Sequence, residues 1–83
     1  MPRVGQELEE KGITLKIMEI VPYFSPTGKR MLLVGYRIID GKFTSTLAHF
    51  FMKANADIRP EVEKVINFYK EQMDIIKGIP INV

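Results

Sequence analysis

Residues 30–40 carry apolar side chains on both faces of an extended segment, and this pattern constrains the fold more than any other feature. Successive side chains of a strand point to opposite faces, so a strand that is apolar on both is typical of the centre of a sheet. We expect the even positions to face the core. That choice leaves Met31, Leu33 and Ile39 on the opposite face, where an exposed apolar patch would mark an interface.

Turn signals flank this central segment and predict an antiparallel meander. Residues 25–28 read Ser-Pro-Thr-Gly, and residues 40–41 read Asp-Gly, both typical of tight turns. Residues 13–24 alternate as a strand until a slip in phase near Met18 and Glu19, which predicts a bulge there. Residues 43–53 are interpreted as the third strand because they follow a hairpin signal, although their apolar spacing would also suit a helix.

Helices are predicted on both sides of the meander. Residues 3–11 are rich in glutamate and end before Gly12, which predicts a short N-terminal helix. Residues 60–77 carry a continuous apolar stripe between Pro60 and Gly78, which predicts a long C-terminal helix packed on one sheet face. The prediction is one α+β domain over residues 1–83 with the order α-β-β-β-α. Residues 79–83 form an apolar tail to which the sequence assigns no role.

The composition argues against catalysis, metal binding and membrane insertion. The chain has no cysteine and one histidine, His49, which has no partner at a metal-ligand or catalytic spacing and is interpreted as a partly buried sheet residue. No apolar run reaches the ~20 residues that span a bilayer, and no secretory signal is visible. We therefore expect a cytoplasmic, non-enzymatic protein without a cofactor. Frequent Ile and Val, mixed charges and few amides are typical of heat-adapted proteins.

Positive charge is concentrated in the predicted sheet. Residues 12–56 carry six basic and two acidic side chains, whereas the flanking segments are slightly acidic. Aromatic residues alternate with these cations, as in sheets that stack bases and neutralise phosphates. The leading hypothesis is a small module that binds nucleic acid, either RNA or DNA. Association with RNA or with the ribosome is the version of this hypothesis that we consider first. Its proposed contacts are Lys16, Lys29, Arg30, Arg37, Lys42 and Lys53.

A second hypothesis is a homodimer, a larger assembly or an adaptor that pairs through the apolar sheet face or the tail. The two hypotheses are compatible, because one concerns charge and the other apolar surface. A simpler interpretation is also open, in which the aromatic residues are core and the cations only keep the surface soluble.

The predicted order of elements resembles that of double-stranded-RNA-binding domains, and Pro26 lies in the loop that such domains place in a minor groove. Those domains begin their last helix with a lysine cluster. Here residues 59–64 read Arg-Pro-Glu-Val-Glu-Lys, with glutamates at positions where those domains carry lysines. The resemblance therefore extends to layout alone, and no family membership is inferred from it.

Overall fold

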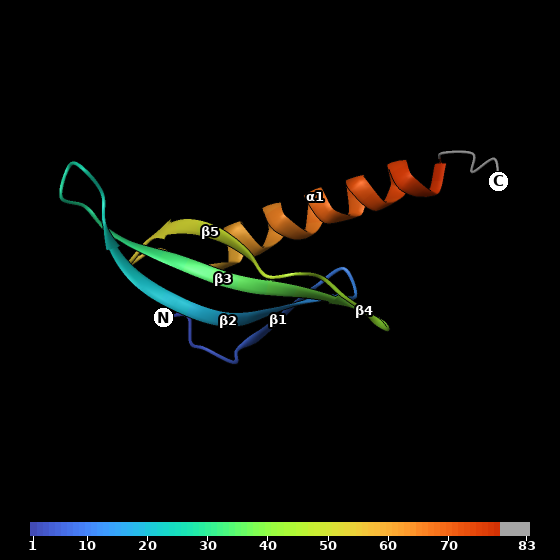
Figure 1. Cartoon of the computed structure of the whole chain (residues 1–83), viewed down its shortest axis with the longest axis horizontal. Helices are drawn as coiled ribbons and strands as arrows, with labels where there is room; N and C mark the ends of the chain where they lie inside the picture. Colours follow the sequence, from blue (N-terminus) through green and yellow to red (C-terminus); the bar gives the residue numbers. More distant parts are fainter. Residues whose placement is uncertain (79–83) are drawn as a thin grey trace.

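The computed structural model describes residues 1–78, which form one antiparallel sheet with a single helix on one of its faces (Figure 1). β1 pairs with β2 and β2 pairs with β3, whose opposite edge pairs with β4 at one end and β5 at the other. The elements are β1 (Glu7–Glu10), β2 (Ile13–Phe24), β3 (Arg30–Asp40), β4 (Phe43–Thr44), β5 (Ala48–Lys53) and α1 (Arg59–Gly78). The predicted tail at 79–83 lies outside the described residues.

The predicted N-terminal helix is wrong, because this segment forms strand β1. Leu8 is the one buried side chain of the strand and lies opposite Leu15, while Glu7 and Glu9 are exposed. A burial pattern with a period of two suits a strand, and two isolated helical turns would be unstable. Lys11 and Gly12, at φ 54° and 78°, form the tight turn into β2. The layout resemblance to double-stranded-RNA-binding domains therefore fails at its first element.

The predicted three-stranded sheet is also wrong, because the sheet has five strands and residues 43–53 are split into β4 and β5. Ser45 lies at the break. Its hydroxyl oxygen accepts a hydrogen bond from the Ile38 backbone N–H at 2.7 Å, and its own N–H donates to the Ile38 carbonyl at 2.8 Å. The chain thus stays attached to β3 through one side-chain and one backbone hydrogen bond before regular pairing resumes at Ala48.

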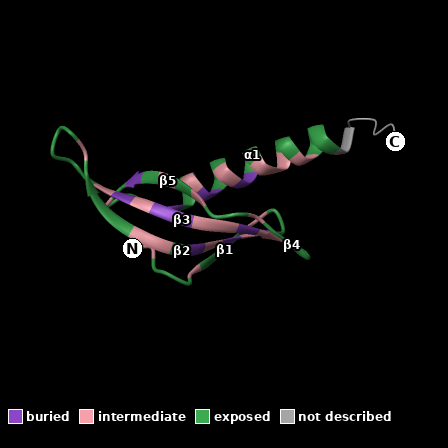
Figure 2. Ribbon diagram, in the orientation of Figure 1, coloured by how far each residue is buried: buried purple, intermediate pink, exposed green. Residues whose placement is uncertain are grey.

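The predicted bulge and the predicted inward face of the central strand are confirmed. The register between β2 and β3 shifts between Ile17 and Glu19, which returns Ile20 to the core side opposite Val34. Leu32, Val34 and Ile38 are buried, as the even positions were expected to be. The C-terminal helix is confirmed too, with Val62 and Ile66 fully buried against the sheet (Figure 2). Within the described residues, no helix is long and apolar enough to cross a membrane.

Tyr69 joins the helix to the end of β3. Its hydroxyl donates a 2.9 Å hydrogen bond to the Asp40 carboxylate, and its ring stacks on Phe43 with centroids 6.0 Å apart. Burial, then the hydrogen bond to Asp40 and the charge of that carboxylate, raise the pKa of Tyr69 above its ordinary value. The neutral phenol is therefore the form that the fold stabilises.

We expect a Tyr69→Phe variant to be about 1 kcal/mol less stable than the wild type at neutral pH, because it lacks the hydrogen bond to Asp40. The contribution of Tyr69 is complete below the pKa of an unfolded tyrosine, about 10, and is lost as pH rises through the higher folded pKa. The gap between the two proteins, measured by chemical denaturation from pH 8 to 11, should therefore close. A constant gap would contradict this role. Tyr36 is present in both proteins, so its ionisation changes both stabilities alike and leaves the gap unaffected.

Candidate nucleic-acid interface

The candidate functional surface is the sheet face opposite α1, called here the open face. No described element covers it, and Figures 1 and 2 show the helix on the other side only. Strand register arranges its side chains in rows that run across β2, β3 and β5. The three rows nearest the β2–β3 hairpin are Tyr23–Met31–Lys53, Val21–Leu33–Phe51 and Glu19–Gly35–His49.

Two aromatic rings dominate the hairpin end of the open face. Tyr23 and Phe51 are 43% and 53% exposed, and their ring centroids lie 5.2 Å apart at an interplanar angle of 49°. They lie on the two strands that flank β3, so the rings meet above Met31 and Leu33, which are half-buried. Exposed aromatic faces on a sheet are the usual platform for stacking unpaired bases.

Three cations surround the same end of the sheet. Lys29 and Arg30 close the β2–β3 hairpin, and Lys53 ends the neighbouring strand β5, whose next residue donates its N–H to the Arg30 carbonyl at 3.2 Å. Lys29, Arg30 and Lys53 line one hollow of about 730 Å³ together with Met1, Ala54 and Asn55. Lys53 shares the row of Met31 on the open face, whereas Arg30 is in phase with Leu32 and lies at the edge of the α1 face. All three cations are exposed, and none forms an ion pair with a described residue. Their charge is therefore available to a phosphate backbone.

Two backbone amides of the hairpin loop are used within the turn itself. The N–H of Gly28 donates to the Ser25 carbonyl at 2.8 Å, and the N–H of Lys29 donates to the Ser25 hydroxyl at 3.1 Å. Both amides are thus used inside the turn. A phosphate at this loop would be held by the lysine and arginine side chains.

The other predicted contacts lie elsewhere. Lys16 and Arg37 form a row in the middle of the open face, where Lys16 has Glu7 beside it and Arg37 donates a 2.8 Å hydrogen bond to the Ser45 carbonyl. Lys42 lies in the turn between β3 and β4, at the far end of β3 from Arg30. The predicted contacts thus divide into three groups: Lys29, Arg30 and Lys53 at the hairpin, Lys16 and Arg37 in the middle of the sheet, and Lys42 at the far end.

The three predicted interface residues all lie on the open face. Met31 and Leu33 lie below the aromatic pair, and Ile39 lies near the opposite end, between Thr14 and Thr44. All three are half-buried, so the apolar surface accessible at the hairpin end comes mainly from Val21, Tyr23 and Phe51.

A hydrogen-bonded contact between His49 and Glu19, which sequence reasoning missed, divides the open face. His49 Nε2 lies 2.6 Å from Glu19 Oε1, and the two side chains meet across Gly35 on the strand between them. A Cβ at Gly35 would lie 2.5 Å from Glu19 Cγ, so only glycine leaves room for the pair. The glycine within an apolar strand was the available signal, because it often marks a close approach. His49 is exposed, not the partly buried residue that we expected.

Replacing Gly35 with alanine should destabilise the protein by about 1–3 kcal/mol, the usual cost of overpacking, because the new methyl displaces Glu19. A double-mutant cycle with Glu19→Ala checks the cause by urea unfolding. In the Glu19→Ala background the same change should cost little, since the clashing side chain is gone. Equal costs in both backgrounds would show that the strain arises elsewhere.

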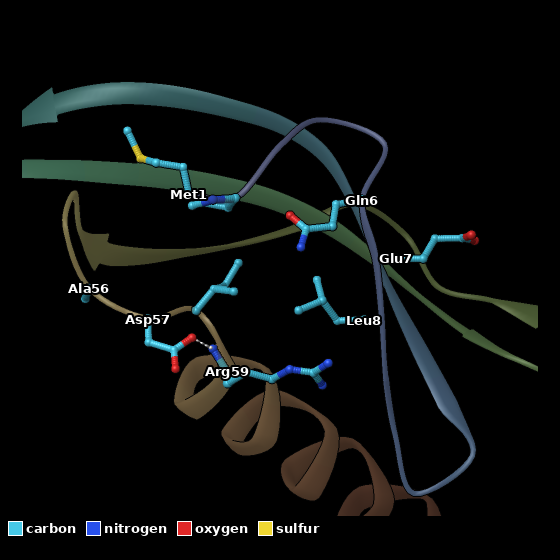
Figure 3. Close-up of a pocket in the computed structure, with 9 residues that line it drawn as sticks. Met1, Gln6, Glu7, Leu8, Ala56, Asp57 and Arg59 are labelled. Atoms are coloured by element: carbon cyan, nitrogen blue, oxygen red, sulfur yellow. Dashed lines mark hydrogen bonds between the residues drawn. The ribbon is translucent and has the colours of Figure 1, made fainter.

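A smaller hollow at the start of α1 does not form a comparable site. Figure 3 shows Gln6 and Leu8 pointing into it and Glu7 pointing away. Asp57 caps the helix here by accepting a 3.0 Å hydrogen bond from the Arg59 backbone N–H. The capping carboxylate occupies the position that an anion would take. Elsewhere, no cluster of three or more His, Asp or Glu among the described residues could hold a metal ion.

Comparison of the chain with protein-family models, with curated proteins and with solved structures found no match. The function is therefore argued from the site alone.

Proposed function

We propose that this protein is a small non-enzymatic module that binds single-stranded nucleic acid on the hairpin end of its open face. The observation that carries the proposal is the exposed pair of Tyr23 and Phe51, 5.2 Å apart, with Lys53 in the next row of the same face. Lys29 and Arg30 lie at the adjoining hairpin, and none of the three cations has an ion-pair partner among the described residues. Aromatic faces stack bases of any sequence, and lysine and arginine neutralise the phosphates between them. A duplex keeps its bases stacked internally and would gain only the charge contacts.

The acidic side chains of the open face limit where the strand can lie. Glu19 lies in the third row from the hairpin, and Glu7 and Glu9 lie on the edge strand β1. Phosphates would be repelled there, so the proposed contacts are Lys29, Arg30 and Lys53. Lys42 is not among them, because it lies at the far end of β3. The absence of cysteine from the chain suits a reducing compartment, and we place the protein in the cytoplasm as part of the same proposal.

Fluorescence anisotropy with labelled single- and double-stranded RNA and DNA tests this function. Three phosphate contacts to a single strand predict a slope of log K against log salt of about −2, so binding should weaken roughly 20-fold between about 50 and 200 mM salt. A Lys29→Ala/Arg30→Ala variant should lose most of that slope, and Lys42→Ala, the matched control, should keep it. No binding at low salt would refute the function and leave a protein partner for the exposed apolar residues.

A further inference from the structure

The contact between Glu19 and His49 lies one row away from the aromatic pair on the open face. His49 is two residues from Phe51 on β5, and Glu19 is two residues from Val21 on β2. Two residues of a strand span about 7 Å, and residues two apart point to the same face. A base stacked on Phe51 can therefore bring one of its edges to this contact.

Glu19 presents a carboxylate with unused hydrogen-bonding capacity. Its Oε1 lies 2.6 Å from His49 Nε2, and because a carboxylate only accepts hydrogen bonds, the imidazole N–H is the donor. The Glu19 side chain forms no other hydrogen bond with a described residue, so Oε2 has no partner there. The Glu19 and His49 side chains are 45% and 39% exposed, and the absence of a side chain at Gly35 lets them meet.

The cations and this carboxylate lie at opposite ends of the aromatic platform. Lys53 is four residues from His49 on β5, about 14 Å along the strand, and Lys29 and Arg30 lie at the hairpin beyond the first row. Phosphates are attracted to the hairpin and repelled by Glu19. A nucleotide on the platform therefore turns its phosphate toward the hairpin and its Watson–Crick edge, the edge away from the sugar, toward Glu19.

We propose that Glu19 reads the Watson–Crick edge of a stacked base and selects guanine, an inference that rests on the proposed function and adds a base preference to it. Guanine places two donors, N1–H and the N2 amino group, side by side on this edge, which matches the two oxygens of a carboxylate. Uracil has one donor between two carbonyl oxygens, and adenine and cytosine each have an amino group beside a ring nitrogen that accepts. Each of these three bases sets an acceptor against the carboxylate. His49 is a positioning residue, because it holds the carboxylate over Gly35.

Anisotropy titrations compare a labelled oligouridine with the same strand carrying one central guanosine, adenosine or cytidine. The guanosine strand should bind the wild type at least about fivefold more tightly than the other three, the lower end of the discrimination by a bidentate contact. If the four strands bind within about twofold of one another, or if another base binds best, the inference is overturned and the proposed function stands. If none of the four binds, the proposed function itself is refuted, and the inference with it.

Glu19→Gln separates base reading from a general effect on the fold. The variant keeps the size of the side chain, removes its charge and turns one acceptor into a donor. The advantage of the guanosine strand should disappear, whereas oligouridine should bind equally or more tightly, because the phosphates are no longer repelled. Glu7→Gln removes the same charge from another strand of the open face and should keep the preference. An equal loss of both strands with Glu19→Gln, or a preference that survives it, would overturn the inference.

Two substitutions of His49 test its positioning role by the ratio of guanosine to uridine affinity, which a loss of folded protein would not change. His49→Ala should lower this ratio, because Glu19 loses its donor. His49→Gln retains an N–H donor and should restore most of the ratio. An unchanged ratio with His49→Ala would overturn the role of His49.

Discussion

Replacing Tyr23 and Phe51 together with alanine is expected to weaken binding of a single-stranded oligonucleotide by about 30-fold or more. Each ring that stacks on a base contributes about 1–3 kcal/mol, and the two rings are the exposed aromatic surface of the open face. Both side chains lie outside the core, so the variant should stay folded. Anisotropy at a fixed low salt concentration measures the change.

The matched control for this change is Phe43→Ala. Phe43 is also an exposed aromatic residue of the sheet, but it stacks on Tyr69 on the helix side. We expect it to affect stability and to leave oligonucleotide binding within about twofold of the wild type. If the double variant binds as the wild type does, or if Phe43→Ala weakens binding equally, base stacking on the open face would be excluded.

Replacing Leu15 with alanine is expected to lower the free energy of unfolding by about 2–5 kcal/mol. Leu15 is fully buried in β2, where it lies between Leu8 on β1 and Ile38 on β3, and the cavity left behind would have little means to collapse. A domain of this size has only about 4–12 kcal/mol of stability, so the variant would be close to unfolding. Urea titration at one protein concentration measures the shift in midpoint.

Val21→Ala provides the comparison within the same strand. Val21 is aliphatic like Leu15 but lies exposed on the open face, so its truncation should cost less than about 1 kcal/mol. Similar costs at the two positions would mean that β2 does not present opposite faces to core and solvent. That result would undermine the assignment of the open face as a binding surface.

The segments that the sequence predicted correctly are those whose own pattern decides their structure. The helix at 60–77 has a continuous apolar stripe and defined ends, and the central strand is apolar on both faces between two turn signals. The bulge at Met18 followed from a break in alternation that only an extra residue repairs. Each of these conclusions needs only neighbouring residues.

The segments predicted wrongly depend on contacts distant in sequence. Residues 7–10 have three glutamates that favour a helix locally, but pairing with Ile13–Lys16 and burial of Leu8 decide for a strand. At the break between β4 and β5, the Ser45 hydroxyl oxygen accepts a hydrogen bond from the Ile38 N–H, a contact that no local pattern predicts. In the same way, the sequence identified basic and aromatic residues but not which of them meet. Only the register shows that Tyr23, Phe51 and Lys53 share one end of the sheet while Lys42 lies at the other.

The most direct test of the central claim is an amide chemical-shift map, recorded by NMR as a short single-stranded oligonucleotide is added to the wild type. We predict that the largest shifts fall on the rows at the hairpin end, at Tyr23, Leu33, Phe51 and Lys53, and on the loop through Lys29. Amides of α1 should be unchanged, because the helix lies on the opposite face. Shifts centred on the helix, or none at saturating oligonucleotide, would contradict the account.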